Sequence, residues 1–539
     1  MLLSGCFVGL HAQGTYDKGF EISKNLEIFA NVYRNIHFNY VDDIDPGKTM
    51  KVAIDAMLAS LDPYTNYYPE SDIEDVKLQL LGEYGGIGAL IHQNGKFVYI
   101  AEPYEGLPAD KAGLKPGDKI VSVNGESAEG KSTADVSGIL RGQSGTDISV
   151  TVERNGKLIT KSITRKEIKL KPVPYYGFVG NDIGYVKLDE FTQNSGTDVH
   201  NAFKALKAER PDMKGFILDL RGNGGGLLNE AVDIVNIFVK RGELIVETKG
   251  KVSAKNTKNY TRNAPEDTEI PVAVLVDAYS ASASEITAGS LQDLDRGVVI
   301  GTRSFGKGLV QNILPMDYNT QMKVTVSKYY IPSGRCIQAV DYANRDAEGR
   351  AVKVPDSLKT AFKTRNGRTV YDGFGIEPDV EVKPEYMSML AMTLTSKFLV
   401  FDYATQFANT HESIAKPSEF EITDDIFADF KRFLADKDYS YNTYTESVLK
   451  QLRETAKEEN YLDSIASALD ALEQKFKSDK LGDIDKHRDE VCELLKNEIL
   501  MRYYYDRGRI EGAIKDDPNV LKAVEVLSDR EQYRKLLGK

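Results

Sequence analysis

Residues 272–285 read VAVLVDAYSASASE, and this stretch decides the fold of the chain. Its first five residues are all apolar, which predicts a short buried strand. A helix is expected directly afterwards, from about Ala283 to Asp293. A strand, a turn of small residues and a helix are typical of proteins that pack helices on a sheet. The stretch therefore predicts an α/β domain around this strand.

The alternation of strand and helix continues on both sides of this stretch. Short apolar runs predict three further strands, at residues 183–188, 215–220 and 298–301. Amphipathic runs predict two helices between them, at residues 199–208 and 227–239. We assign residues 172–384 to this core, and residues 342–371 to a polar, irregular loop inserted into it.

Three serines lie in the turn between the predicted strand and helix: Ser280, Ser282 and Ser284. A nucleophile in such a turn shares its space with backbone amides and a helix N-terminus. Both favour the negative charge of a tetrahedral intermediate. The plainer interpretation is a group of N-cap serines on a helix of small residues. The serines alone do not decide between the two.

Residues 301–311, GTRSFGKGLVQ, supply a candidate base. The glycines around Lys307 let the backbone pack closely and bury the lysine stem, and a desolvated lysine can act as a neutral base near pH 7. Ser–Lys pairs are a variant of the serine-nucleophile arrangement, and Gln311 is placed to hold the amine. The segment nearly matches a phosphate-binding loop. However, Gly308 stands where that loop needs Ser or Thr, which argues against a nucleotide.

Residues 218–228, LDLRGNGGGLL, form a third motif of strand, glycine loop and helix. The spacing fails for a dinucleotide-binding loop because position 227 is Leu. Free amides in the loop could form an oxyanion hole, and a simple tight turn is the alternative. A Ser-His-Asp triad is the competing mechanism, but none of the six histidines stands beside a glycine-framed or acidic motif.

The first dozen residues resemble a targeting segment. Residues 1–10 are almost wholly apolar, and LHAQ at 10–13 looks like a cleavage site, so residues 1–12 are expected to be a signal peptide. Residues 3–6 also fit a lipoprotein box, in which Cys6 would carry a lipid anchor, and a buried N-terminus is the third interpretation. No later stretch reaches the roughly 18 apolar residues of a membrane span. We expect a periplasmic or otherwise extracytoplasmic protein.

Three further regions flank the core. Residues 20–80 carry two amphipathic helices and form a small helical N-terminal domain. Residues 84–168 change to short β runs with Asn-Gly turns and one helix near 134–140, which predicts a mostly β domain. Residues 385–539 are helical, with apolar stripes typical of core or partner-helix faces. The chain is thus expected to be a multidomain α+β protein whose terminal helices could build a homo-oligomer.

Composition narrows the classes of partner. The 539 residues carry a formal net charge of −12, and the length predicts three or four domains. No basic block stands out, which argues against nucleic acid as a partner. Metal-ligand spacings such as His-Glu-x-x-His and paired cysteines are absent from the sequence, so no metal or other cofactor is expected.

Taken together, these motifs resemble a known family. SASASEI followed by FGKGLVQ is similar to the carboxyl-terminal processing proteases, the tail-specific peptidases of family S41, which are PDZ-containing Ser–Lys endopeptidases. The resemblance covers roughly residues 20 to 385. Further landmarks of the family lie at residues 61–65, 221–226, 329–338 and 375–379.

The resemblance implies a role for each site residue. Ser282 would be the nucleophile, Lys307 the general base, and Gln311 the residue that orients the base. The amides of Gly225 and Ala283 would form the oxyanion hole.

The β domain resembles the PDZ module of the family. Its carboxylate-binding loop would be formed by Gly86, Ile87, Gly88 and Ala89, and a bound peptide would add a strand to the sheet edge. The resemblance thus implies a serine endopeptidase that acts on unfolded or C-terminally exposed proteins. The alternatives are a catalytically silent or gated PDZ scaffold, an oligomeric adaptor, and a nucleotide-binding protein.

Overall fold

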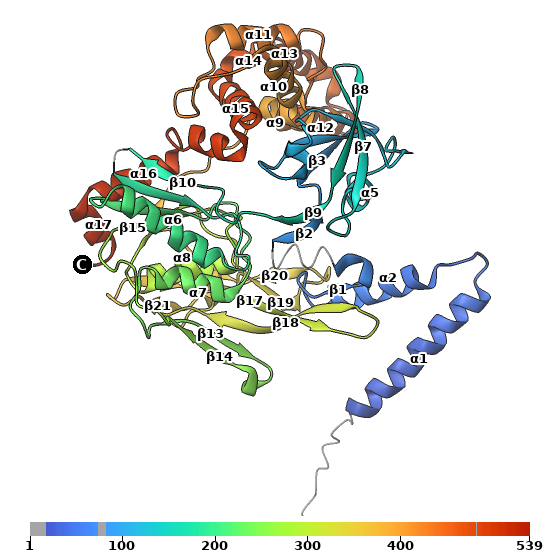
Figure 1. Cartoon of the computed structure of the whole chain (residues 1–539). Helices are drawn as coiled ribbons and strands as arrows, with labels where there is room; N and C mark the ends of the chain where they lie inside the picture. Colours follow the sequence, from blue (N-terminus) through green and yellow to red (C-terminus); the bar gives the residue numbers. More distant parts are fainter. Residues whose placement is uncertain (1–17, 74–81, 181, 481) are drawn as a thin grey trace, which may run out of the picture. The chain divides into compact units, whose positions relative to one another are not determined.

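The computed structural model describes residues 18–73, 82–180, 182–480 and 482–539 (Figure 1). The signal peptide expected at residues 1–12, with Cys6, lies outside the described residues. The chain divides into two compact units. One comprises the described residues up to 70 together with 311–325, and the other comprises the described residues of 71–310 and 326–539. Within the described ranges, no helix is long and apolar enough to span a membrane.

The smaller unit begins with two helices, α1 (Lys18–Asn39) and α2 (Pro46–Ala59). Asp45 caps α2 by accepting a hydrogen bond from the Lys48 amide at 3.0 Å, and Pro46 suits the first helical position. The strand β1 (Asn66–Tyr68) pairs with residues 321–323 at the start of β18 (Gln321–Tyr330). The helical N-terminal domain is thus confirmed, with a small sheet added to it.

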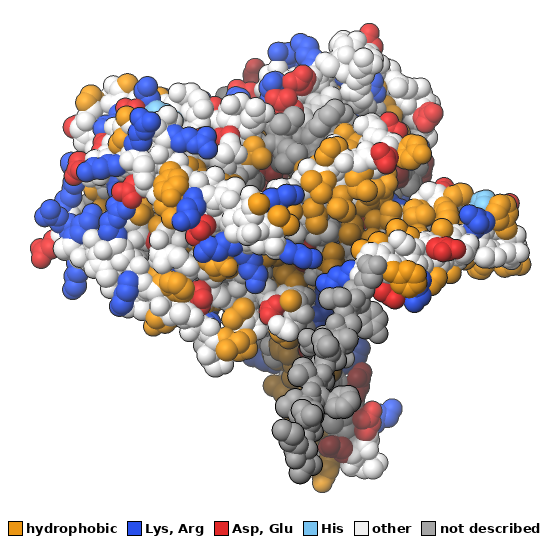
Figure 2. Space-filling view, turned by 90° about the horizontal axis from the view of Figure 1, so that it is seen from below, with side chains coloured by type: hydrophobic (Ala, Val, Ile, Leu, Met, Phe, Trp, Pro, Cys, Tyr) orange, Lys and Arg blue, Asp and Glu red, His pale blue; other side chains and the backbone are white. Residues whose placement is uncertain are grey.

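Apolar side chains are exposed along both helices of this unit. No residue of α1 is buried, and Phe20, Ile22, Leu26 and Phe29 are among its exposed large apolar residues. In the space-filling view of Figure 2, apolar side chains gather on the face of the molecule that is turned toward the viewer.

The larger unit contains the expected β domain. Its sheet has the order β3-β4-β5-β7-β8, with β6 beside β5. The strands are β3 (Ala89–Asn94), β4 (Phe97–Pro103), β5 (Lys119–Val123), β6 (Glu126–Ser127), β7 (Asp147–Arg154) and β8 (Lys157–Thr164). The helix α5 (Thr133–Leu140) packs near β3, α4 (Pro108–Lys111) follows β4, and β2 (Glu83–Gly86) pairs with β9 (Lys166–Lys169). This arrangement matches the PDZ-like expectation.

The α/β core is a six-stranded sheet of order β10-β11-β12-β15-β16-β23. All neighbours are parallel except the antiparallel pair β10–β11. The strands are β10 (Tyr175–Val179), β11 (Ile183–Lys187), β12 (Gly215–Asp219), β15 (Val272–Val276), β16 (Val298–Gly301) and β23 (Val380–Glu381). One face is covered by three helices: α6 (Ser195–Glu209), α7 (Leu228–Asn236) and α8 (Ala283–Asp293).

The last helices of the chain cover the other face of this sheet. Alternate residues of β12, β15 and β16 pack against α16 (Pro518–Ser528), α17 (Arg530–Leu536) and the end of α15 (Arg488–Ala513). The fully buried Val520, Ala523 and Val526 lie in this layer. The sheet is therefore buried on both sides, which explains why its strands read as unbroken apolar runs.

The described residues between β23 and α15 form six further helices. They are α9 (Met389–Ser396), α10 (Leu399–Thr410), α11 (Asp424–Leu434), α12 (Tyr444–Glu458), α13 (Leu462–Lys480) and α14 (Asp483–Lys486). The helices α9, α10, α11 and α14 form a separate apolar cluster with the first half of α15, whereas α12 packs against α13. Two segments of the C-terminal region contact the β domain: Phe398, which precedes α10, stacks on His92 of β3 with ring centroids 4.2 Å apart, and the Tyr505 hydroxyl of α15 donates to Asp110 at 2.8 Å.

Residues 342–371 are more regular than expected. Instead of one irregular loop, the structure has two small antiparallel pairs. One joins β19 (Val340–Arg345) to β20 (Ala351–Lys353), and the other joins β21 (Ala361–Lys363) to β22 (Thr369–Tyr371). These strands are short and mostly polar, so they lack the apolar alternation by which a strand is recognised in sequence. Before this segment, β13 (Leu244–Gly250) pairs with β14 (Thr257–Tyr260) and with residues 327–330 of β18.

Candidate active site

Ser282 occupies the turn between β15 and α8 in a strained conformation. Its φ is 57° and its ψ is −112°, a combination that non-glycine residues rarely adopt. The other two serines of the cluster are fully buried and engaged by the neighbouring loop. Ser280 donates its hydroxyl hydrogen bond to the Leu220 carbonyl at 2.8 Å, and Ser284 donates to the Asn223 carbonyl at 2.9 Å. Ser282 is the partly exposed serine of the three.

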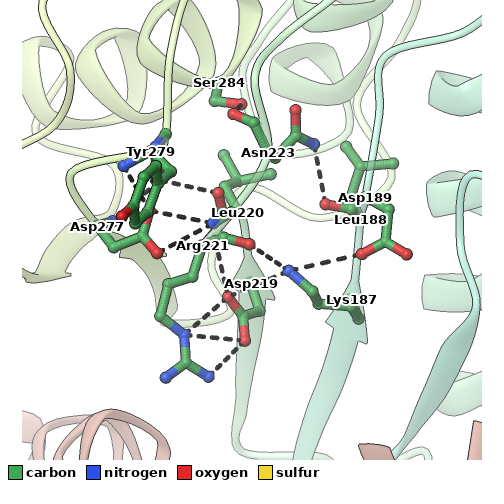
Figure 3. Close-up of polar contacts among 12 residues, drawn as sticks. Lys187, Leu188, Asp189, Asp219, Leu220, Arg221, Asn223, Asp277, Tyr279 and Ser284 are labelled. Carbon is green, nitrogen blue, oxygen red and sulfur yellow. Dashed lines mark hydrogen bonds and ion pairs between the residues drawn. The ribbon is translucent and has the colours of Figure 1, made fainter. Parts of the chain in front are cut away.

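The loop of residues 221–226 is tied to the ends of three parallel strands (Figure 3). The Asp277 carboxylate accepts from the Gly222 amide at 3.0 Å, and the Asn223 side chain donates to the Leu188 carbonyl at 2.9 Å. The ammonium group of Lys187 donates to the Arg221 carbonyl. These bonds gather the loop at the carboxyl ends of β11, β12 and β15, the edge at which open α/β sheets hold their ligands.

Gly225 lies directly against the serine turn. A Cβ added to it would meet the Ser282 Cβ at 2.7 Å and the Ala283 amide nitrogen at 2.9 Å, and its φ is +102°. Only glycine therefore fits at this position. The structure brings Gly225 and Ala283 to Ser282, as expected for oxyanion-hole residues. However, the Gly225 N–H donates to Asn223 Oδ1 at 2.8 Å, so it is already engaged in this conformation.

Glu285 joins the serine turn to the lysine loop. Its Oε2 accepts from the amides of Ser282 and Lys307, both at 2.9 Å. Its Oε1 accepts from the Ser304 hydroxyl at 2.5 Å and from the Gly306 amide at 2.7 Å. Glu285 is fully buried, and this burial raises its pKa to about 7 although the four hydrogen bonds act to lower it.

Tyr329 makes a second link between the same two segments. Its buried hydroxyl lies 2.7 Å from the Lys307 carbonyl oxygen and 3.1 Å from that of Ser282. Burial raises the pKa of Tyr329 well above its ordinary value, so the phenol keeps its proton and can donate. The backbones of Ser282 and Lys307 are thus held together on both sides.

Sequence reasoning assigned no bridging role to Tyr329 or to Glu285. Tyr329 carries no local signal, because its partners are far away in the sequence. The spacing Ser282-x-x-Glu285 is a capping-box pattern, and it could have indicated that the glutamate binds the Ser282 amide.

Gln311 belongs to the smaller unit of the chain. It lies in β17 (Leu309–Pro315), where its Nε2 donates to Thr325 Oγ1 at 3.1 Å. Its role in orienting Lys307 therefore stays a prediction.

The expected carboxylate-binding loop connects β2 to β3. Gly86 ends β2, Ile87 is buried, Gly88 has φ +73°, and Ala89 begins β3. The carbonyls of Ile87 and Gly88 accept from the amides of Ala109 and Tyr104 at 2.8 and 3.0 Å. Among the described strands, β3 is at the end of its sheet and pairs only with β4, and the helix α5 packs near it.

Charges at the start of the glycine loop are tightly paired. Burial acts to raise the pKa of Asp219, but Arg221 and Lys187 outweigh it and hold the pKa at about 2. The carboxylate accepts from Arg221 at 2.6 Å and from the Tyr185 hydroxyl at 2.8 Å. This ionised carboxylate therefore fixes the Arg221 side chain where the loop begins.

Three family models match the chain. Residues 182–344 match peptidase family S41, residues 99–154 match the PDZ domain, and residues 390–527 match the "probable PDZ-protease, C-terminal helical domain".

Curated relatives agree with these matches. A carboxy-terminal-processing protease of Bartonella bacilliformis is 37% identical over 321 residues, which cover 59% of this chain and 73% of the relative. A "probable CtpA-like serine protease" of Staphylococcus aureus is 32% identical over 382 residues, covering 70% of this chain and 69% of the relative. The solved structure of a photosystem II D1 C-terminal processing protease is 27% identical, covers 67% of this chain and 94% of its own, and has a TM-score of 0.37.

Proposed function

The chain belongs to the carboxy-terminal-processing proteases of peptidase family S41 and is a serine-type peptidase with a PDZ domain, and from this we propose that Ser282 and Lys307 carry out its chemistry. The observation that carries the proposal is the pair of bridges between the two residues. One oxygen of Glu285 binds both amides, and the Tyr329 hydroxyl contacts both carbonyls. A turn and a loop from different parts of the core are thereby held as one site.

In the proposed mechanism, the Ser282 hydroxyl attacks the scissile carbonyl while the neutral Lys307 amine takes its proton. Lys307 then gives the proton to the leaving amine, and an acyl-enzyme remains. Water, deprotonated by the same lysine, releases the acyl group. Gln311 is proposed to orient Lys307. No metal or nucleotide takes part in these steps.

The oxyanion of the tetrahedral intermediate is proposed to bind the amides of Ala283 and Gly225. The Ala283 amide opens α8, where the helix dipole favours a negative charge. The Gly225 amide must turn from Asn223 Oδ1 to the substrate before it can donate to the oxyanion. That rearrangement favours a gated enzyme, in which substrate capture completes the site, over a permanently silent scaffold.

Substrates are proposed to be proteins with an exposed, apolar C-terminus. The terminal carboxylate would bind the loop of Gly86, Ile87, Gly88 and Ala89, and the preceding residues would pair with the edge of β3. The chain before the bound C-terminus would then reach Ser282.

Two further proposals concern location and assembly. We propose an extracytoplasmic location, with residues 1–12 as the targeting segment or Cys6 as a lipid anchor. The exposed apolar residues of α1 support a homo-oligomer formed through the terminal helices, because a lone amphipathic helix gains most of its stability by covering such a face.

The experiment incubates the mature protein with an unfolded model protein that ends in apolar residues. A matched substrate ends in two aspartates. Cleavage of the first substrate that disappears in both Ser282→Ala and Lys307→Ala, and that is unaffected by a metal chelator, supports the Ser–Lys mechanism. C-terminal peptides that bind without any cleavage would favour the scaffold.

A further inference from the structure

The helix α16 is joined to the glycine loop of the active site through Asp517, the residue that precedes and caps it. Asp517 caps α16, where its Oδ1 accepts from the amides of Asn519 and Val520 at 2.8 and 3.0 Å. The same carboxylate accepts two hydrogen bonds from Arg221 Nη1, at 3.0 Å to Oδ1 and 2.7 Å to Oδ2. One side chain thus starts a C-terminal helix and binds the arginine that opens the glycine loop.

Arg221 is held between two carboxylates. Its Nε and Nη2 bind Asp219, with a shortest distance of 2.6 Å, while its Nη1 binds Asp517. The three side chains are largely withdrawn from water: Arg221 is 20% exposed, Asp219 2% and Asp517 23%. At this burial a charged pair is screened far less than at the surface, so the contact has a defined geometry.

The loop that follows Arg221 leads directly to the nucleophile. Gly222 binds Asp277, Asn223 receives the Ser284 hydroxyl, and Gly225 touches Ser282. The position of Arg221 therefore sets where this loop begins relative to the serine turn (Figure 3). A change at Asp517 can reach Gly225 through this path.

We propose that Asp517 is a positioning residue for the peptidase, and that the C-terminal helix α16 is in this way a working part of the active site. Asp517 fixes Arg221, Arg221 fixes the loop of residues 222–226, and the loop holds Gly225 beside Ser282, where its amide reaches the oxyanion once it turns from Asn223 Oδ1. This inference rests on the proposed function for its effect on catalysis, and on the structure alone for its effect on the loop.

A purely structural role for Asp517 predicts different behaviour, and two substitutions separate the roles. Asp517→Asn keeps a good N-cap and loses the charge that binds Arg221. Asp517→Glu keeps the charge and weakens the cap. Asp529 offers a matched control, because it caps α17 by accepting from Glu531 and Gln532 at 3.0 Å each and has no bond to Arg221 among the described contacts.

The first readout is steady-state cleavage of a quenched unfolded substrate by the full chain. We expect kcat of Asp517→Asn to fall about 10- to 100-fold, as for a misplacement of about 1 Å, with KM changed less than about 2-fold. Asp517→Glu should recover much of the kcat that Asp517→Asn loses, although it should melt at a lower temperature than the wild type. Asp529→Asn should keep the wild-type kcat.

The second readout is hydrogen exchange of the amides of residues 222–226, which needs no activity. Exchange should become faster in Asp517→Asn but not in Asp529→Asn. Unchanged exchange together with unchanged kcat in Asp517→Asn would overturn the inference and leave Asp517 as a helix cap. If the wild type cleaves nothing, the proposed function fails, while the exchange rates still decide whether Asp517 positions the loop.

Discussion

Replacing Glu285 by Gln tests how the serine and the lysine are held together. The substitution keeps the shape of the side chain, but it turns one acceptor oxygen into an NH2 group. Each oxygen of Glu285 now accepts two hydrogen bonds, so two donors lose their acceptor whichever oxygen is replaced. We expect a folded protein with little activity.

The change in the free energy of unfolding of Glu285→Gln follows from two opposing contributions. Hydrogen bonds to a charged group contribute about 1.5–3 kcal/mol each, so two lost bonds weaken the fold by about 3–6 kcal/mol. The neutral amide avoids the burial penalty of the carboxylate. A rise of the Glu285 pKa from 4.5 to about 7 corresponds to about 3 kcal/mol. The free energy of unfolding at pH 8 should therefore fall by less than these ~3–6 kcal/mol, whereas kcat should fall at least ~100-fold because Ser282 and Lys307 are no longer held in register.

The stability difference should also depend on pH. The folded-state pKa of Glu285 is raised, so between about pH 4.5 and pH 7 the folded protein holds a proton that the unfolded chain has lost. The contribution of this group to stability therefore falls as the pH rises through that window, and it stays constant above it. The advantage of the wild type over Glu285→Gln should accordingly be larger at pH 5 than at pH 8, by about 3 kcal/mol.

The assay combines urea denaturation, followed by tyrosine fluorescence because the chain has no tryptophan, with steady-state cleavage. Glu230→Gln is a suitable control. Glu230 is also a buried glutamate, and it accepts from the Gly196 and Asn194 amides at the start of α6. It should lose stability and keep its kcat. A Glu285→Gln variant that keeps kcat within about 3-fold would refute the reasoning, since the bridge would then not be what positions the dyad.

Two further predictions concern other parts of the site. Tyr329→Phe removes the hydroxyl that contacts the carbonyls of Ser282 and Lys307. In cleavage assays kcat should fall about 10-fold, and in urea denaturation the free energy of unfolding should fall by about 1 kcal/mol. An unchanged kcat would show that Glu285 suffices to hold the two segments together. Gly88→Val places a β-branched side chain at φ +73°, and its Cβ would lie 2.8 Å from the Leu107 side chain. C-terminal peptides should therefore bind at least ~10-fold more weakly in a fluorescence titration. Labelling of Ser282 by a small fluorophosphonate should be unaffected in this variant, and equal loss of both would indicate general misfolding.

The strands and helices of the core could be predicted because each leaves a local pattern. Val272–Val276 and the other parallel strands are buried on both faces and therefore read as apolar runs. The Asn-Gly turns of the β domain could be predicted because this pair tolerates the positive φ that such turns require. Asn124 and Asn155 both have positive φ and are followed by Gly125 and Gly156. The short polar strands at residues 340–371 have no such pattern and were missed.

Individual site residues could be named from motifs, but the contacts that hold them could not. Tyr329 and Asp517 act on partners that are brought near only by the fold, and so does Glu285 where it binds the lysine loop. The sequence Asp517-Pro518 does indicate a helix start. Its contact with Arg221, almost three hundred residues earlier in the chain, depends on how α16 packs on the sheet and leaves no trace in local sequence.

Mass spectrometry of the protein treated with a fluorophosphonate is the most direct test of a Ser282 nucleophile activated by Lys307. The reagent forms a stable bond with an activated serine, and digestion shows which serine of the stretch 280–284 carries it. The account predicts label on Ser282 alone, and no label in Lys307→Ala. Label on Ser280 or Ser284, or labelling of Ser282 at an undiminished rate in Lys307→Ala, would contradict it.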